Sequence, residues 1–438
     1  MKNIFSLLVI PQLVMNLWSQ PTPLTMKKAV EMALAPDGNS KLQLLREAQL
    51  AAVARKNTVK GALLPNVDAA ITETDFTRNL KAFGFSIPIP GFKSPTLVGP
   101  LSNFDIRATV SQSIFDFSAW KRLDAAKANM AVAEAEKEAA SNQVADAVAR
   151  AYLIALRNKS AVDTVNANVE LAQKLVRLAE NQKEAGTGTG VEVTRAKVQL
   201  ANEKQRLSVA ELELDAAKLH LMRTIGMDLG VHIELADTLT MPTSTAANLE
   251  EAMASAKQYR PDWLAQKRRE QAASLNYQAV RAERLPSLGA FADYGALGIS
   301  PGGALATHTL GASLKVPIFD GGRRDSRRVE SAISLRQEAI RTKDFAQQVE
   351  LEVRLALGAV YASEGQVKVA EEGLALSVQE LEQAERRYRE GVSNSLELVD
   401  AQTRLARARD NRTFALYQNN VARIDLATAM GALHRILQ

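Results

Sequence analysis

Hydrophobic and polar residues follow two different periods along this chain. In four stretches they alternate, so that one face is apolar and the other is polar, which predicts β-strands. The predicted strands are residues 67–77, 103–115, 287–297 and 308–319. In the last of them the apolar face carries Leu310, Ala312, Leu314 and Val316, and the polar face carries Thr309, Ser313 and Lys315. Each strand has about 11 residues, the length of a tilted strand that spans a bilayer.

Elsewhere the apolar residues recur every three or four positions, as in an α-helix. Residues 117–184 contain neither proline nor glycine, and as one helix they would be about 100 Å long at about 1.5 Å per residue. A shorter helix is expected to return over 191–225, and the same pair recurs over 322–390 and 395–430. The sequence therefore predicts a mixed but mostly α fold with long antiparallel helical hairpins.

The same plan occurs twice, in residues 20–245 and in residues 246–438. Each copy holds two predicted strands followed by one hairpin, and the hairpins cover about 117–226 and about 322–430. We interpret the chain as an internal two-fold repeat, because the order and spacing of the elements agree between the copies.

Prolines and glycines mark equivalent positions in the two copies. Pro65 and Pro286 each follow a helical pattern and precede the first strand of their copy, so they are predicted helix–strand junctions. Gly186 and Gly391 each end a long helical pattern, which predicts the two tip turns of the hairpins.

Composition and charge exclude several classes of function. The 438 residues contain no cysteine, so disulfides, cysteine metal sites and cysteine nucleophiles are excluded. The net charge of +5 is spread over interleaved basic and acidic residues, which does not form the basic face that nucleic acid requires. The four histidines lack the spacing of metal ligands, and the chain has no catalytic triad or cofactor loop. We therefore expect no metal, no cofactor and no enzymatic activity.

Residues 1–19 have the features of a secretory signal peptide. Lys2 precedes an apolar run that is too short to span a membrane comfortably, and residues 17–19 offer a cleavage site. An amphipathic N-terminal anchor is the alternative. Since no later stretch is apolar enough for a transmembrane helix, any membrane insertion would use the strands.

Four strands are too few to close a transmembrane barrel, which needs about eight or more. If the strands span a membrane, several chains must therefore share one barrel with lipid outside and water inside. An antiparallel sheet in a soluble domain is the alternative. The remaining elements are long helices, however, and they offer nothing to cover the apolar face of such a sheet.

Several weak motifs in matching order resemble the TolC family of outer-membrane efflux and secretion channels. They are the duplicated plan, the helix–proline–strand junctions, residues 110–116 (VSQSIFD), and residues 396–401 (LELVDA) after Tyr388 and Gly391. The resemblance implies a homotrimer with a shared β-barrel in contact with outer-membrane lipid, and a helical barrel that extends into the periplasm. It also implies passive export of cargo from an inner-membrane pump through a periplasmic adaptor, without specifying the cargo or the pump class.

In the TolC family the hairpin tips form the periplasmic gate. By this resemblance, the acidic rings that narrow the entrance fall on Glu397 and Asp400, the tyrosine before the turn on Tyr388, and the acid of the first repeat on Glu192. The family prototype also has an arginine two residues after the tip glycine, which locks neighbouring coils together. The chain has Ser393 at that position and therefore lacks the arginine of this lock.

Simpler explanations of these residues remain open. Glu192 and Glu397 lie in first helical turns, where the helix dipole stabilises a carboxylate by about 0.3–1 kcal/mol without any gate. Arg195 occupies the twin position of Asp400 and is the best substitute for the missing lock, but Glu192 at i,i+3 is an equal candidate as its partner. Arg404 can partly offset the charge of Asp400 at i+4.

Two classes of function follow from the pattern. The first is a transport channel, and the second is a non-transport coiled-coil scaffold or adhesin of the cell envelope. The alternating strands and the acidic pair that is specific to one tip favour the channel, because a scaffold needs neither.

Overall fold

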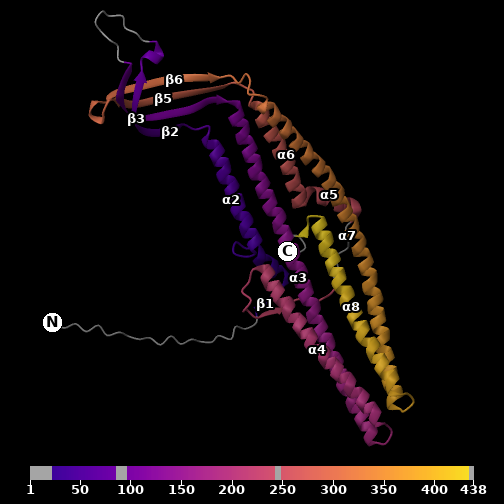
Figure 1. Ribbon diagram of the computed structural model, residues 1–438. Helices are drawn as coiled ribbons and strands as arrows, with labels where there is room; N and C mark the ends of the chain where they lie inside the picture. Colours follow the sequence, from indigo (N-terminus) through magenta and orange to yellow (C-terminus); the bar gives the residue numbers. More distant parts are fainter. Residues whose placement is uncertain (1–21, 85–95, 242–247, 434–438) are drawn as a thin grey trace, which may run out of the picture. The chain divides into compact units, whose positions relative to one another are not determined.

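A computed structural model defines the fold and describes residues 22–84, 96–241 and 248–433. Within these ranges the chain is mainly α-helical (Figure 1). The predicted signal peptide lies outside the described residues. None of the helices in the described ranges is both long enough and apolar enough to cross a membrane.

The elements follow the two periods of the sequence. The helices are α1 (Met26–Leu34), α2 (Ser40–Gly61), α3 (Phe117–Glu184), α4 (Gly190–Ile225), α5 (Leu249–Tyr259), α6 (Pro261–Ala282), α7 (Arg323–Arg389) and α8 (Ser395–Ala429). The strands are β1 (Thr22–Leu24), β2 (Asn66–Asn79), β3 (Leu97–Asp116), β4 (Ile233–Leu235), β5 (Ser287–Gly298) and β6 (Leu305–Lys315). Helix α3 covers the range that the sequence predicts.

The chain divides into two compact units, each built from separated segments. The hairpin unit comprises Met1–Leu44, Ala139–Arg260 and Gln348–Gln438, and the sheet unit comprises Leu45–Glu138 and Pro261–Gln347. Each unit thus combines segments of both sequence repeats. The two sequence repeats, residues 20–245 and 246–438, therefore do not coincide with the two compact units, and the division into two structural repeats stays a prediction.

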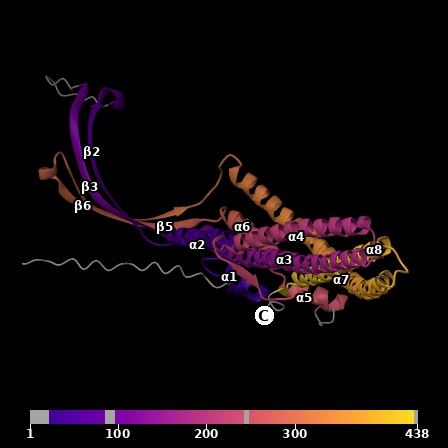
Figure 2. The same ribbon diagram turned by 90° about the horizontal axis from the view of Figure 1, so that it is seen from below.

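Within the described residues of the sheet unit, β2, β3, β5 and β6 form one antiparallel sheet in that order. The sheet is curved along its strands (Figure 2). Side-chain hydrogen bonds join the helices in the same order: Lys137 of α3 to Gln49 of α2 (3.0 Å), Arg269 of α6 to Glu136 of α3 (2.7 Å), and Gln266 of α6 to Glu338 of α7 (3.0 Å). The helices of this unit are therefore neighbours in the order α2, α3, α6, α7, which matches the order of the strands β2, β3, β5, β6.

The strand register separates an apolar from a polar face. Leu310 lies opposite Ala292 and Leu314 opposite Leu288, whereas Thr309 and Ser313, on the other face, lie opposite Asp293 and Gly289. On the polar face Arg107 forms ion pairs with Asp105 at 2.9 Å and with Asp293 at 3.1 Å. Leu310 and Leu314 remain largely exposed. The apolar face of the single chain is therefore uncovered.

Three predicted strand boundaries are wrong. Strand β6 begins at Leu305 and not at residue 308. Strand β6 ends at Lys315 and not at residue 319, so Val316 lies beyond its apolar face. Pro317 explains this end, because proline has no N–H to donate to a neighbouring strand. Strand β3 begins at Leu97 and not at residue 103, because the ends of β2 and β3 remain paired where their alternation is weak.

The hairpin unit contains the turns from α3 to α4 and from α7 to α8 (Figure 1). A cluster of buried residues from α3, α7 and α8 joins the two hairpins near these turns. It comprises Leu175, Leu381, Ala384, Tyr388, Leu398, Ala401 and Leu405. Leu175 of α3 thus packs the first hairpin against the second.

The hairpin unit also contains a short parallel strand pair, β1 with β4, which the sequence pattern does not predict. The buried Tyr152 of α3 donates its hydroxyl hydrogen to the carbonyl oxygen of Leu24 at 2.9 Å. The carboxylate of Asp237 accepts from the backbone N–H of Met26 at 2.8 Å. Three-residue strands from distant parts of the chain leave no local period in the sequence, so pattern analysis misses them.

Candidate functional site at the hairpin tips

Both tip turns depend on a glycine with a left-handed backbone. The φ angle is 78° at Gly186 and 71° at Gly391. Next to these glycines, the N–H of Thr187 donates to the carbonyl of Gln182, and the N–H of Val392 donates to that of Arg387, both at 3.0 Å. A side chain would meet no neighbour at either glycine, so the positive φ, and not crowding, requires glycine there.

The first turn of each returning helix is capped by a side chain. Glu192 accepts from the backbone N–H of Thr189 at 2.8 Å, and Thr189 accepts from the backbone N–H of Glu192, which together form a capping box. At the second tip, Asn394 accepts from the backbone N–H groups of Leu396 and Glu397. Capping thus accounts for the position of Glu192 without a gate.

The two acids of the second tip are paired with arginines. Glu397 lies 3.0 Å from Arg387, and Asp400 lies 3.2 Å from Arg404, the i,i+4 partner that the sequence suggested. Arg404 also contacts Glu380 at 2.7 Å. The side chains of Glu397 and Asp400 are 45% and 65% exposed, so each pair contributes only about 0–1 kcal/mol.

Sequence reasoning did not single out Arg387 and Glu380. The ion pairs Arg387–Glu397 and Glu380–Arg404 follow one antiparallel register of α7 and α8. Glu380 precedes Arg387 by seven residues on α7, and Arg404 follows Glu397 by seven residues on α8. The sequence did contain a signal for the pair Arg387–Glu397. The last turn of α7 is basic, and the first turn of α8, directly after the tip turn, contains an acid.

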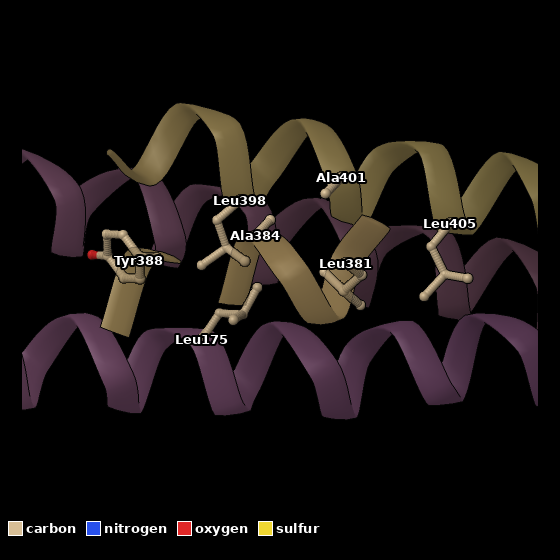
Figure 3. Packing of buried hydrophobic residues seen from close by; sticks show 7 residues of the cluster. All are labelled: Leu175, Leu381, Ala384, Tyr388, Leu398, Ala401 and Leu405. Carbon is tan, nitrogen blue, oxygen red and sulfur yellow. The ribbon is translucent and has the colours of Figure 1, made fainter. Parts of the chain in front are cut away.

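Tyr388 is a buried anchor between the hairpins. It stands at the end of the cluster of leucines and alanines, and its hydroxyl points away from them (Figure 3). Gln182 of α3 donates to the carbonyl oxygen of Tyr388 at 2.9 Å. Burial raises the pKa of the phenol above its ordinary value, and the negative charge of Glu192 adds to the shift. The hydroxyl therefore keeps its proton at neutral pH and remains a hydrogen-bond donor.

Arg195 is exposed and lies beside a groove between α4 and α8. The groove has a volume of about 620 Å³, and apolar side chains that include Val198 and Leu396 line it. Among the described residues no ion pair joins Arg195 to Glu192, so the i,i+3 pair suggested by the sequence is not formed. The carboxylate of Glu192 is turned toward Thr189 instead.

The remaining predicted positions are the two junction prolines and the serine of the second tip. Pro65 and Pro286 immediately precede β2 and β5, a few residues after the ends of α2 and α6. The hydroxyl of Ser393 donates to the carbonyl oxygen of Asn394 at 3.3 Å and supplies no charge in place of the family arginine. Within the described ranges, no group of three or more acidic or histidine side chains is placed to hold a metal ion.

Comparison with known proteins assigns the family. The family model described as "Outer membrane efflux protein" matches residues 97–227 and 252–432. The pyoverdine export outer membrane protein OpmQ of Pseudomonas putida is 26% identical over 359 residues, which are 75% of this chain and 71% of OpmQ. The outer membrane protein TolC of Vibrio cholerae is 23% identical over 331 residues, 74% of this chain and 75% of TolC.

The fold agrees with this assignment. The crystal structure of the outer membrane protein VceC of Vibrio cholerae superimposes with a TM-score of 0.76 at 19% identity, and the match covers 93% of this chain and 96% of VceC. The family model covers more than half of the chain, and its two matched segments lie one in each sequence repeat. The chain therefore belongs to the outer membrane efflux protein family, to which TolC channels belong, and it is an outer-membrane channel protein that extends into the periplasm and is not an enzyme.

Proposed function

We propose that this chain is the exit duct of a tripartite efflux or type I secretion system and assembles as a homotrimer. The observation that supports this proposal most is the sheet, in which β2 and β6 are the edge strands and the apolar face is uncovered. Unpaired backbone groups at a sheet edge are costly in lipid, so β6 of one copy must pair with β2 of the next. A shared barrel satisfies both edges and exposes the apolar face to outer-membrane lipid.

A passive duct needs partners that supply the cargo and the energy. The proposed partners are a periplasmic adaptor and an inner-membrane pump, which hand over small molecules or proteins. The names of the relatives describe different cargoes, since OpmQ exports pyoverdine and TtgF belongs to a toluene efflux pump. Cargo thus differs within one channel family, which fits selection by the pump and not by the duct.

The second tip is the proposed gate, with Glu397 and Asp400 as its acidic rings. In a trimer, three copies of each acid approach one axis, where confined like charges disfavour full ionisation and attract cations. Their exposure and their weak pairs with Arg387 and Arg404 leave both carboxylates accessible to ions from the periplasmic side. The gate further includes Tyr388 and Glu192 and, as a cation available to a neighbouring copy, Arg195.

The experiment combines assembly with single-channel recording. The purified protein should migrate as a heat-dissociable trimer and form a narrow, cation-preferring pore that multivalent cations block from the tip side. The double change Glu397→Ala and Asp400→Ala should weaken that block. The matched control is Glu371→Ala, which removes an acid of similar exposure that is paired with Arg412 on the same hairpin.

The control should leave the block intact. An unchanged block in the Glu397→Ala, Asp400→Ala protein would place the constriction elsewhere. A monodisperse, monomeric protein that is soluble without detergent would contradict the duct itself, and it would favour the envelope scaffold or adhesin.

A further inference from the structure

A small cavity with both polar and apolar side chains in its wall lies just behind the tips, inside the hairpin unit. Residues of α3, α4, α7 and α8 line it, among them Glu192, Gln199, Tyr388, Ser395 and Gln402. The space open to the centre of a water molecule is about 20 Å³. A cavity needs at least about 10–15 Å³ on this measure to hold one water molecule, so this one is large enough.

Three polar side chains of the cavity wall are buried without a partner. Tyr388, Ser395 and Gln402 are 4%, 7% and 2% exposed. Within the part of the chain that the structure describes, the hydroxyls of Tyr388 and Ser395 and both amide atoms of Gln402 have no hydrogen-bond partner. Buried polar atoms in native proteins are nearly always satisfied by protein or by ordered water. All four atoms belong to residues that line the same cavity.

The polar residues are placed with helical regularity. Ser395 and Gln402 are seven residues apart on α8, and Glu192 and Gln199 are seven residues apart on α4. Seven residues are two turns, so on each helix the two polar positions lie on one face. The cavity therefore belongs to a polar seam between the hairpins, beside the apolar cluster that includes Leu398 and Leu405.

We propose that this cavity binds one ordered internal water molecule, which accepts a hydrogen bond from Tyr388 and bridges to Ser395 and Gln402. Tyr388 is a suitable donor, because its phenol is protonated at neutral pH. The hydroxyl of Ser395 and the amide of Gln402 each offer both donor and acceptor capacity. A water molecule with two to four such partners is a stable part of a protein interior.

The bound water has a consequence for opening, which rests on the proposed gate function. Opening the second tip separates Tyr388, Ser395 and Gln402 from α4. At a hydrated polar seam these groups exchange one bound water for bulk water, whereas an apolar contact would expose new apolar surface on separation. The seam therefore favours parting of the hairpins at this position.

The water site is tested by the sign of a stability change. With a bridging water, Tyr388→Phe breaks a hydrogen bond and should lower the apparent Tm of the full-length trimer. The control is Tyr152→Phe, which breaks the direct bond to Leu24 and should lower Tm as well. If the Tyr388 hydroxyl were merely buried and unpaired, its removal would raise Tm, and the proposal would be overturned.

A second variant and a direct observation complete the test. Gln402→Met keeps the side-chain length and removes both amide atoms, so its effect on Tm should be less than additive with that of Tyr388→Phe. A high-resolution map of the unaltered trimer should show ordered density within hydrogen-bond distance of at least two of the three side chains, and Gln402→Met should lose it. An empty cavity in that map, or strict additivity, overturns the water site.

The gating consequence has its own readout. Gln402→Met should lower the open fraction in single-channel recordings, because an apolar contact then replaces the hydrated seam. An unchanged open fraction would refute the consequence for gating. A protein that forms no pore would contradict the proposed function, whereas the map and the Tm comparison would still decide the water site.

Discussion

The facing of β6 predicts how the chain tolerates charge in the membrane. Leu310 is the middle residue of β6 (Leu305–Lys315), lies on the apolar face opposite Ala292, and is 82% exposed in the single chain. Leu310→Arg would place a guanidinium against lipid near the bilayer midplane, which costs about 2–4 kcal/mol in each chain. Leu314→Arg lies next to the strand end, where the cost falls to about 0–1 kcal/mol.

The matched control is Thr309→Arg, at the same height on the polar face. Thr309 lies opposite Asp293, so the new guanidinium would find water and a carboxylate. The assay is the yield of heat-dissociable trimer from outer-membrane fractions, together with denaturant unfolding of the purified trimer. Since about 1.4 kcal/mol corresponds to a factor of ten, Leu310→Arg should reduce folding more than tenfold relative to Thr309→Arg. Equal losses at Leu310 and Thr309 would refute the facing of the sheet. A larger loss at Leu314 than at Leu310 would refute the placement of Leu310 near the bilayer midplane.

Two further predictions concern the hairpin unit. Arg195→Ala should raise the resting conductance of the pore. Its effect should combine with that of Asp400→Ala less than additively, because both side chains would act in one contact between copies. Simple additivity of the two effects would exclude Arg195 as the lock. Desolvation raises the pKa of the Asp410 carboxyl, although Arg206 and Arg157 oppose the shift, and the residue remains exposed, so solvent screening keeps the effect on stability small. A folded pKa above the unfolded one contributes stability at low pH that is lost as the pH rises through the folded pKa, so Asp410→Asn should raise Tm slightly at pH 7 and bring no gain near pH 4. An equal gain at both pH values would contradict the desolvation of this carboxyl.

Long elements with uninterrupted periods were predictable from the sequence. Helix α3 covers the predicted range because 68 residues without proline or glycine keep one helical period throughout. The turns at Gly186 and Gly391 were predictable because a left-handed backbone restricts the choice of residue. Where one residue interrupts a period, as Pro317 does after Lys315, the alternating pattern extended the predicted strand too far.

The chemistry of the tip could be predicted only in part. The pair Asp400–Arg404 lies on one helix at i,i+4, so the sequence contains its geometry. The pair Arg387–Glu397 joins two helices, and its distance depends on how the turn sets the register of α7 against α8. The expectation for Arg195 and Glu192 failed for a local reason, because the capping box with Thr189 decides where the Glu192 carboxylate points.

The sequence by itself determined the period of the long helices and of the four sheet strands, the alternation of apolar and polar faces within them, and the glycines at the turns, because these depend on neighbours within a few positions of the chain. Only the tertiary structure decided that β1 pairs with β4, that Tyr388 is buried against Leu398, and that polar atoms of Tyr388, Ser395 and Gln402 meet at one cavity. Those contacts join residues of different helices or strands, and their energies depend on packing and desolvation, which a local pattern does not encode.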